Sequence, residues 1–374
     1  MKKLTLSILA SVISFSLWAE IAVTFADRFL NETVPGVVVV SGFGDILGIS
    51  DADGKISVDE SDFPLSVRSL GYEAATVKEK SDTVYLTPAT YSLGEVIVTP
   101  VDRPITRVLT YVREYINASV YPDTMQCYNQ YMYEYFITDG KVKGYNKSDA
   151  SGRKRNVISY SRYLDEDGDN LYGPGEDPDA EIFSLAHLMA KIPTNVIHAP
   201  EAIRSGAKDF TVQGKYYPEY AWRKSNDLLI VDHDLLAGNK NHTLSPLAFK
   251  IIGMTTDITE MRYSHAFRHN DAGQYDIYDY LYGISTYHMS LKGKIFKKAL
   301  GIKEAVEMDG YVEYYPVLIQ HLNVDEYKAL KKEKGRTIEF IYPDNVPPLL
   351  PAVERLVERV DQKKITQHQS VEQP

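Results

Sequence analysis

The sequence predicts a chain in two parts: an N-terminal all-β sandwich of the transthyretin or immunoglobulin-like type, followed by an α+β domain rich in antiparallel strands. Three observations predict this arrangement. Residues 20–100 hold short apolar runs separated by turn residues, at a spacing typical of a β-sandwich. Residues 101–346 mix long alternating runs with helical spacing, and they lack the regular strand–helix alternation of a parallel sheet. At 374 residues the chain is long enough for two domains with separate cores.

The first 19 residues are expected to be a secretory signal peptide. Lys2 and Lys3 form a basic start, residues 4–18 form an apolar run, and Ala19 is a small residue suited to the cleavage position. No later stretch approaches the roughly 20 apolar residues that a spanning helix needs. We therefore expect an exported protein without a spanning helix, located in the periplasm or associated with the outer membrane.

Charge restricts the classes of partner, and cysteine content restricts how the domains can be stabilised. The formal net charge is −10, and no basic stripe offsets it, so nucleic acid is not an expected partner. Cys127 is the single cysteine, which excludes an intramolecular disulfide. Each domain must therefore be stable through its own core.

Strands of the first domain are expected wherever an apolar run is closed by Gly, Pro, Asn or Asp. The four consecutive valines at 37–40 indicate a strand that is buried on both sides. The expected strands cover residues 21–25, 37–40, 45–49, 55–58, 65–70, 83–86 and 93–99.

Four motifs of this region recur in a known family. They are residues 35–39 (PGVVV), 48–58 (GISDADGKISV), 67–72 (VRSLGY) and 93–98 (LGEVIV). In their order and spacing they resemble the carboxypeptidase regulatory-like domain, a transthyretin-like sandwich of Gram-negative envelope proteins. The resemblance implies an accessory module without peptidase activity. Residues 26–31 depart from the family, because they lack its usual glycine-rich opening.

The segment Asp51-Ala52-Asp53-Gly54 has two interpretations. Carboxylates two residues apart can share a calcium ion, but the later ligands of an EF-hand are missing. A tight turn is the favoured interpretation, with the aspartates accepting local backbone N–H groups and Gly54 taking a positive φ.

In the second domain, apolar residues at helical spacing over 102–116 predict a helix that Asp102 could cap and that ends near Tyr121-Pro122. A long alternating strand is expected at 128–138, with residues 157–164 as its partner. Residues 325–334 are expected to form a lysine-rich surface helix. After Pro347, a proline-rich segment leads to a short amphipathic stretch at 353–360 and a polar tail, which is expected to be disordered up to residue 374. Other expected elements are a helix at 181–191 and strands at 228–231, 248–253, 275–289, 310–318 and 337–342.

Two groups of residues are weak candidates for a metal site. His265 and His269 have the i, i+4 spacing that places two imidazoles on one helical face, but Ala266 stands where a zinc peptidase needs its glutamate base. Asp165, Asp167 and Asp169 belong to the densest acidic run and are the better candidates for calcium. Surface or core histidines and a solvated acidic loop are the favoured interpretations. No cofactor is therefore expected, with Ca²⁺ as the alternative.

No phosphate-binding glycine loop and no nucleophile elbow is present. The second domain contains most of the 28 tyrosines, which suit strands and also half-wet binding surfaces. The leading hypothesis is a non-catalytic envelope protein that binds another envelope protein or a glycan through this domain. An exported hydrolase of peptide or glycan, in which a metal ion could take part, is the alternative, and a structural component of the outer membrane is a third hypothesis.

Overall fold

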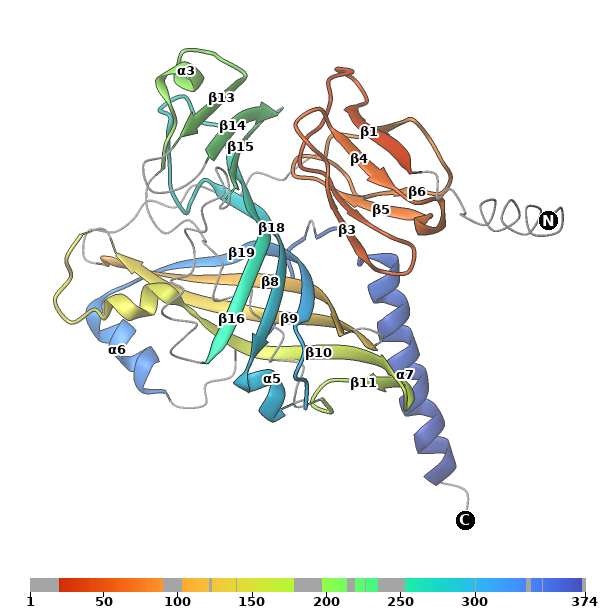
Figure 1. Ribbon diagram of the computed structural model, residues 1–374. Helices are drawn as coiled ribbons and strands as arrows, with labels where there is room; N and C mark the ends of the chain where they lie inside the picture. The colour runs from red at the N-terminus through yellow and green to blue at the C-terminus, as the bar shows by residue number, and fades with distance from the viewer. Residues whose placement is uncertain are drawn as a thin grey trace. The chain divides into compact units, whose positions relative to one another are not determined.

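The computed structural model of the protein describes residues 20–89, 103–120, 123–138, 140–177, 197–213, 219–225, 227–234, 253–299, 301–333, 338–344 and 346–371. The chain is mostly β-strand and divides into two compact units (Figure 1). The first unit comprises the described residues up to Ser69 together with Glu73–Thr87, and the second comprises Leu70–Tyr72 and the described residues from Pro88 onward. None of the helices in the described part of the chain is long and apolar enough to cross a membrane.

The first unit contains two sheets. One has three strands in the order β4-β1-β7, and the other has four strands in the order β3-β2-β5-β6. β1 pairs with β4 in the antiparallel and with β7 in the parallel direction. The strands are β1 (Ile21–Asp27), β2 (Val38–Val40), β3 (Ile46–Ile49), β4 (Lys55–Val58), β5 (Leu65–Arg68), β6 (Ala75–Val77) and β7 (Thr83–Leu86).

Six of the seven strands expected in this region are confirmed, and the seventh, at 93–99, lies outside the described residues. The four valines at 37–40 are at most 1% exposed, as expected for a strand buried on both sides. Asp51 Oδ1 accepts the backbone N–H groups of Asp53 and Lys55, and Gly54 has a φ of +73°. The turn interpretation of this segment is therefore confirmed.

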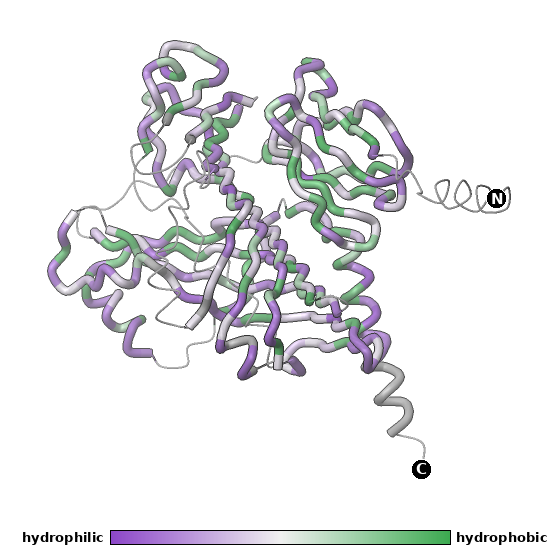
Figure 2. The backbone as a smooth tube through the Cα atoms, in the orientation of Figure 1, coloured by the Kyte–Doolittle hydropathy of each residue, from purple (hydrophilic) through white to green (hydrophobic). Residues whose placement is uncertain are grey.

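The second unit is built on one ten-stranded antiparallel sheet in the order β11-β10-β9-β8-β19-β18-β16-β15-β14-β13. Hydrophobic residues run along the strands of both units (Figure 2). The strands of the large sheet are β8 (Ile105–Val120), β9 (Asp123–Thr138), β10 (Arg153–Asp165), β11 (Gly168–Tyr172), β13 (Asp209–Gln213), β14 (Glu219–Ser225), β15 (Leu228–Asp234), β16 (Met254–Arg268), β18 (Tyr280–Gly293) and β19 (Val306–Leu322), and the short strands β12 (Ile197–His198) and β17 (Gln274–Tyr275) pair separately.

The helix predicted over residues 102–116 is wrong, because this segment is strand β8. Its side chains are buried on both faces of the sheet, so apolar residues stand at odd and at even positions and the period of two is hidden. Its β-branched and aromatic residues, such as Val108, Tyr111 and Val112, suit a strand. The expected strand at 128–138 and its partner at 157–164 are confirmed as β9 and β10.

The expected helix at 325–334 is confirmed as α6 (Val324–Lys332), whose N-cap Asn323 accepts the N–H groups of Asp325 and Glu326. The disordered tail is wrong over most of its length, because α7 (Pro351–Val371) continues well beyond residue 360. No strand forms over 338–342. The expected helix at 181–191 and residues 248–252 lie outside the described residues. The strand expected at 228–231 falls within β15, the one at 275–289 within β17 and β18, and the one at 310–318 within β19. The remaining helices are α3 (Glu201–Arg204), α5 (Lys294–Ala299) and the 3-10 turns η1 (Glu60–Asp62) and η2 (Lys147–Ser151).

The large sheet has two distinct faces. We call one the tyrosine face, because a buried cluster on it includes Tyr131, Tyr135, Tyr263, Tyr287 and Tyr314. We call the other the helix face, because α6 packs there through Tyr327 against Phe136, and α7 begins there beside Tyr115 and Tyr128. Most tyrosines of the described strands are thus core residues.

Candidate functional site

The two histidines that the sequence puts forward as metal ligands are not brought together. His265 lies within β16, and His269 follows the end of that strand. The helical spacing assumed for them is wrong, since four residues span about 13 Å along a strand. His265 is buried, whereas His269 is exposed and lies 3.6 Å from a carboxylate oxygen of Asp271.

His265 lies instead beside His233 of β15, with 5.7 Å between the ring centroids. Residues 232–234 belong to the same strand. The rings of Tyr220 and Tyr280 pack against this pair at centroid distances of 4.2 and 5.5 Å. Within the described ranges, no three His, Cys, Asp or Glu side chains are grouped so that they could hold a metal ion. The histidine pair is therefore part of an aromatic cluster.

The acidic run forms a hairpin between β10 and β11 in place of the expected solvated loop. Asp165 ends β10 and accepts the backbone N–H of Asp167, which lies in the turn. On β11, Asp169 accepts hydrogen bonds from Arg162 at 2.7 Å and from Arg359 of α7 at 2.8 Å. These bonds, that of Arg162 first, lower the pKa of Asp169 to about 2. The run thus anchors α7 to the sheet.

Cys127 is fully buried on the tyrosine face, 3.4 Å from the amide oxygen of Asn129. Burial, followed by the nearby Glu114 carboxylate, raises the pKa of the thiol well above its ordinary value. The neutral thiol is a poor nucleophile, so this cysteine does not have the environment of a catalytic one.

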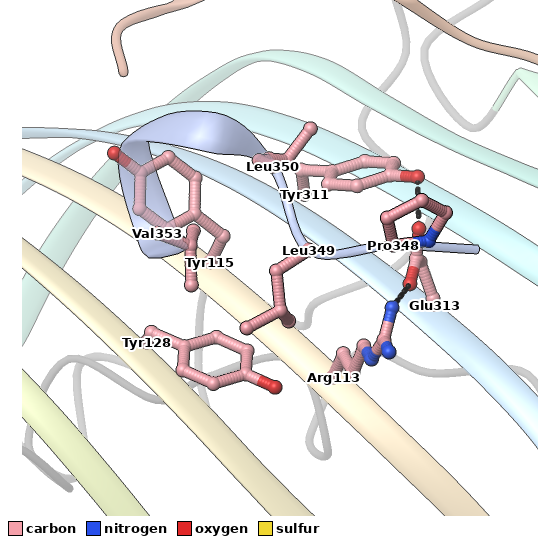
Figure 3. Close-up of a pocket in the computed structure, with 9 residues that line it drawn as sticks. All are labelled: Arg113, Tyr115, Tyr128, Tyr311, Glu313, Pro348, Leu349, Leu350 and Val353. Carbon is pink, nitrogen blue, oxygen red and sulfur yellow. Dashed lines mark hydrogen bonds and ion pairs between the residues drawn. The ribbon is translucent and has the colours of Figure 1, made fainter. Parts of the chain in front are cut away.

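On the helix face, the segment 348–353 closes a small crevice of about 20 Å³ (Figure 3). Leu349 and Leu350 lie against the rings of Tyr115, Tyr128 and Tyr311. The space is enough for about one water molecule. The crevice is therefore a packing site for the start of α7 and is too small for a ligand.

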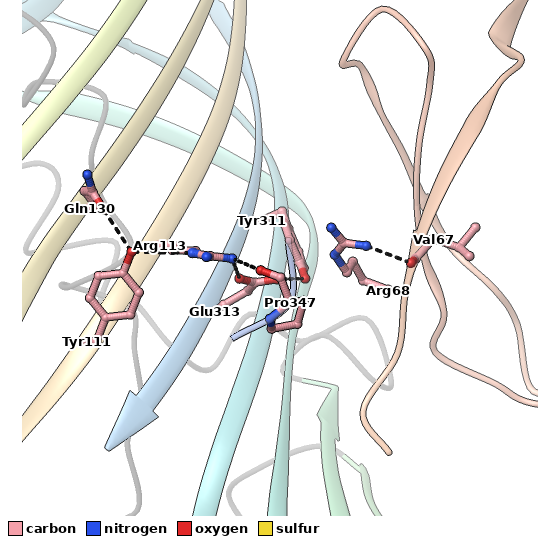
Figure 4. Close-up of polar contacts among 8 residues, drawn as sticks. All are labelled: Val67, Arg68, Tyr111, Arg113, Gln130, Tyr311, Glu313 and Pro347. Atoms are coloured by element: carbon pink, nitrogen blue, oxygen red, sulfur yellow. Dashed lines mark hydrogen bonds and ion pairs between the residues drawn. The ribbon is translucent and has the colours of Figure 1, made fainter. Parts of the chain in front are cut away.

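A hydrogen-bonded chain next to this crevice fixes the same segment (Figure 4). Arg113 contacts a carboxylate oxygen of Glu313 at 3.4 Å and donates to the carbonyl of Pro347 at 2.7 Å. Tyr311 donates to Glu313 at 2.6 Å, and Tyr111 lies 3.5 Å from the Arg113 guanidinium. Burial alone would lower the pKa of Arg113, but the Glu313 carboxylate and the Tyr111 hydroxyl raise it above its ordinary value. The arginine stays charged and acts as a clamp.

A larger cavity, of about 190 Å³, lies where β8, β9 and β10 meet residues 302–306; we call it the tip cavity. Its apolar lining comes from six side chains, and Leu164 among them is 43% exposed. Ser119 and Thr124 add hydroxyl groups. The full lining consists of Ala118, Ser119, Val120, Asp123, Thr124, Met125, Tyr163, Leu164, Asp165, Ile302 and Val306.

Two aspartates of the lining stand on neighbouring strands. Met125 pairs with Tyr163 and Thr124 pairs with Leu164, so the next rung places Asp123 opposite Asp165. Because side chains alternate along a strand, both carboxylates lie on the same face as Met125 and Tyr163, which is the tyrosine face. Asp165 is one of the calcium candidates in the acidic run, whereas no sequence pattern links Asp123 to it.

Comparisons with known proteins assign no family. No protein-family model and no curated protein matches the chain. A solved structure of lipovitellin, from a study of lipid–protein interactions in that protein, aligns with 59% of this chain and 26% of its own length. The identity is 10% and the TM-score is 0.29, so this likeness supports no inference about fold or function.

Proposed function

We propose that this protein is a non-catalytic, exported envelope protein that binds a partner protein through the tip cavity of its second unit. The observation that carries the proposal is the cavity itself: a mainly apolar space with an exposed apolar rim at Leu164. Concave, largely apolar sites with a few polar groups are where proteins bind small groups. Export rests on the signal peptide expected at residues 1–19.

A protein partner fits this cavity better than a glycan does. Sugars are bound by exposed aromatic rings with polar groups around them, but the tyrosine face is built from buried rings such as Tyr131 and Tyr314. Among the described residues, Tyr85 and Tyr342 are the only tyrosines that are strongly exposed. An apolar cavity of about 190 Å³ is below the roughly 300–1,000 Å³ of clefts for drug-sized ligands, and suits a single side chain.

We also infer that the first unit is a β-sandwich of the carboxypeptidase regulatory type, acting as an accessory module. The sheet orders β4-β1-β7 and β3-β2-β5-β6 support the sandwich, and the four motifs at 35–98 support the family. A module of this type, together with the expected signal peptide, supports a location in the periplasm or at the outer membrane.

Site-specific photo-crosslinking in growing cells tests the proposed function. A benzophenone side chain would replace Leu164 at the cavity rim or, as the control, Phe210 on β13, which is 41% exposed and does not line the cavity. We expect one discrete protein adduct from position 164 and none of that mass from position 210. The adduct should disappear when Val120→Trp fills the cavity. Equal adducts from both positions, or an adduct that survives Val120→Trp, would refute binding through the cavity.

A hydrolase is the second candidate function, and one observation favours it. Asp123 and Asp165 present two carboxylates to one cavity, and paired carboxylates are the groups that glycosidases use. Incubation of the purified protein with chromogenic glycosides and with a peptide library decides between the two. Turnover that is lost in Asp123→Asn and in Asp165→Asn would establish the hydrolase and overturn the non-catalytic assignment.

A further inference from the structure

We infer that the tip cavity receives a cationic side chain, a lysine or arginine of the partner protein, with its aliphatic stem against the apolar lining and its charged end between Asp123 and Asp165. This inference rests on the proposed function and specifies its ligand. It follows from three properties of the cavity: its unbalanced charge, its size and its lining.

Other buried carboxylates of the second unit show how this sheet balances charge. Each of the four that the structure describes has a lysine or arginine partner within 4 Å. Burying a carboxylate without a partner is costly, and these pairings offset that cost. The pairs are Glu114 with Lys154, Glu134 with Arg107 and Arg155, Asp149 with Lys331, and Glu313 with Arg113.

The tip cavity holds two aspartates that are less buried than these four and have no such basic partner among the described residues. Asp123 and Asp165 are partly buried on adjacent strands, and like charges directly opposite each other destabilise a sheet. No described lysine or arginine lines the cavity or forms an ion pair with either aspartate. The cavity is therefore a region of negative potential, which a cation would neutralise.

Size and lining select the kind of cation. A volume of about 190 Å³ exceeds what a bare metal ion needs, and the six apolar side chains offer a metal ion no ligand. Lysine and arginine combine an aliphatic stem with a charged end, and they bury the stem along apolar surface. The charged end then makes charge-assisted hydrogen bonds to the two carboxylates. A basic side chain therefore matches both parts of the lining.

Ligand-observed NMR with the full-length protein tests the inference. The probes are n-hexylamine, 1-hexanol and hexanoate, which share one apolar chain and differ in the charge of the end group. We expect saturable binding of n-hexylamine with an affinity at least about tenfold higher than that of hexanoate, since a tenfold ratio needs only about 1.4 kcal/mol. The double variant Asp123→Asn, Asp165→Asn should lose about tenfold in affinity for n-hexylamine and should bind 1-hexanol unchanged. Asp167→Asn is the matched control, since Asp167 belongs to the same hairpin but does not line the cavity.

The outcomes separate this inference from the proposed function. If the three probes bind equally and lose binding in Val120→Trp, the inference of a cationic ligand is overturned, but the proposal of an apolar binding cavity stands. Failure of all three probes to bind would overturn the cavity as a binding site. Thermal unfolding shows whether the variants fold. Removing two opposed charges should leave the transition temperature of the double variant equal to or above that of the wild type, and a lower value would contradict the assumed repulsion.

Discussion

The packing of Tyr287 on Gly310 offers a direct test of how the large sheet is stabilised. The two residues are cross-strand partners on β18 and β19, and the ring lies over the glycine. A Cβ atom added at position 310 would lie 1.9 Å from Cζ of Tyr287, whereas carbon atoms in contact stand about 3.5–4.0 Å apart. In Gly310→Ala the ring must therefore move by roughly 1.6 Å, the difference between these distances.

The expected free-energy cost of Gly310→Ala depends on the burial of the Tyr287 ring. Tyr287 is 4% exposed, so it cannot move into solvent without leaving the core. Overpacking of this kind costs about 1–3 kcal/mol, and replacing glycine in a strand returns about 0.5–1 kcal/mol of chain entropy. Because the ring must move far, we take the cost near the top of its range, and after subtracting the entropy term we expect Gly310→Ala to lower the free energy of unfolding of the second unit by about 2 kcal/mol.

Urea unfolding followed by tryptophan fluorescence measures this change, because Trp222 is buried in β14 of the same sheet. A double-mutant cycle with Tyr287→Val supplies the control. Without the ring, the alanine should cost less than about 0.5 kcal/mol, which gives a coupling energy of about 1.5 kcal/mol or more. An equal penalty in both backgrounds, or no penalty in the wild type, would refute the packing argument.

Three further predictions concern charged and buried groups. Asp169→Asn should lower the free energy of unfolding, measured by chemical denaturation, by about 1 kcal/mol, a value reduced because the aspartate is partly exposed. Because the folded pKa of about 2 lies below the ordinary 3.8, this contribution is present above pH 3.8 and fades as the pH falls toward 2. The Nδ1–H group of His288 donates a 2.6 Å hydrogen bond to the Asp309 carboxylate, which raises the pKa of His288, and NMR titration should show that this pKa is lower in Asp309→Asn. The stabilisation is present below pH 6.5 and is lost as the pH rises through the folded value, and an unchanged pKa in the variant would contradict it. Cys127 should react with a thiol reagent only as the protein unfolds, and rapid labelling under native conditions would refute its burial.

The sequence predicted the short strands well, because turn residues mark their ends. Gly54 and the aspartates of 51–53 indicated a turn, and the structure contains it. The long strands were harder to predict. β8 looked helical because Ile105, Val108, Leu109 and Val112 share a helical face, yet they lie on two faces of a strand that is covered on both sides.

Long-range pairing limited the prediction of α7. Its polar residues beyond 360 indicated a disordered tail, since they offer no apolar face. In the structure, Arg359 bonds to Asp169 and Lys363 donates to the carbonyl of Leu171, in each case about 190 residues away along the chain. Such contacts order a polar helix, and no local pattern reveals them.

Long-range contacts also limited the prediction of the candidate site. The sequence shows that acidic residues are densest at 165–169, but it does not show which of these carboxylates has a basic partner in the fold. Asp169 is held by two arginines, so its charge is already balanced in the fold. Asp165 belongs to the same run but lies opposite Asp123, where a second negative charge raises the cost of the first. The fold pairs the fully buried carboxylates of this unit with basic side chains and leaves this partly buried pair opposed, so binding of a cation there would stabilise it. The balance of charge in three dimensions therefore identifies the tip cavity, and it predicts the sign of its ligand.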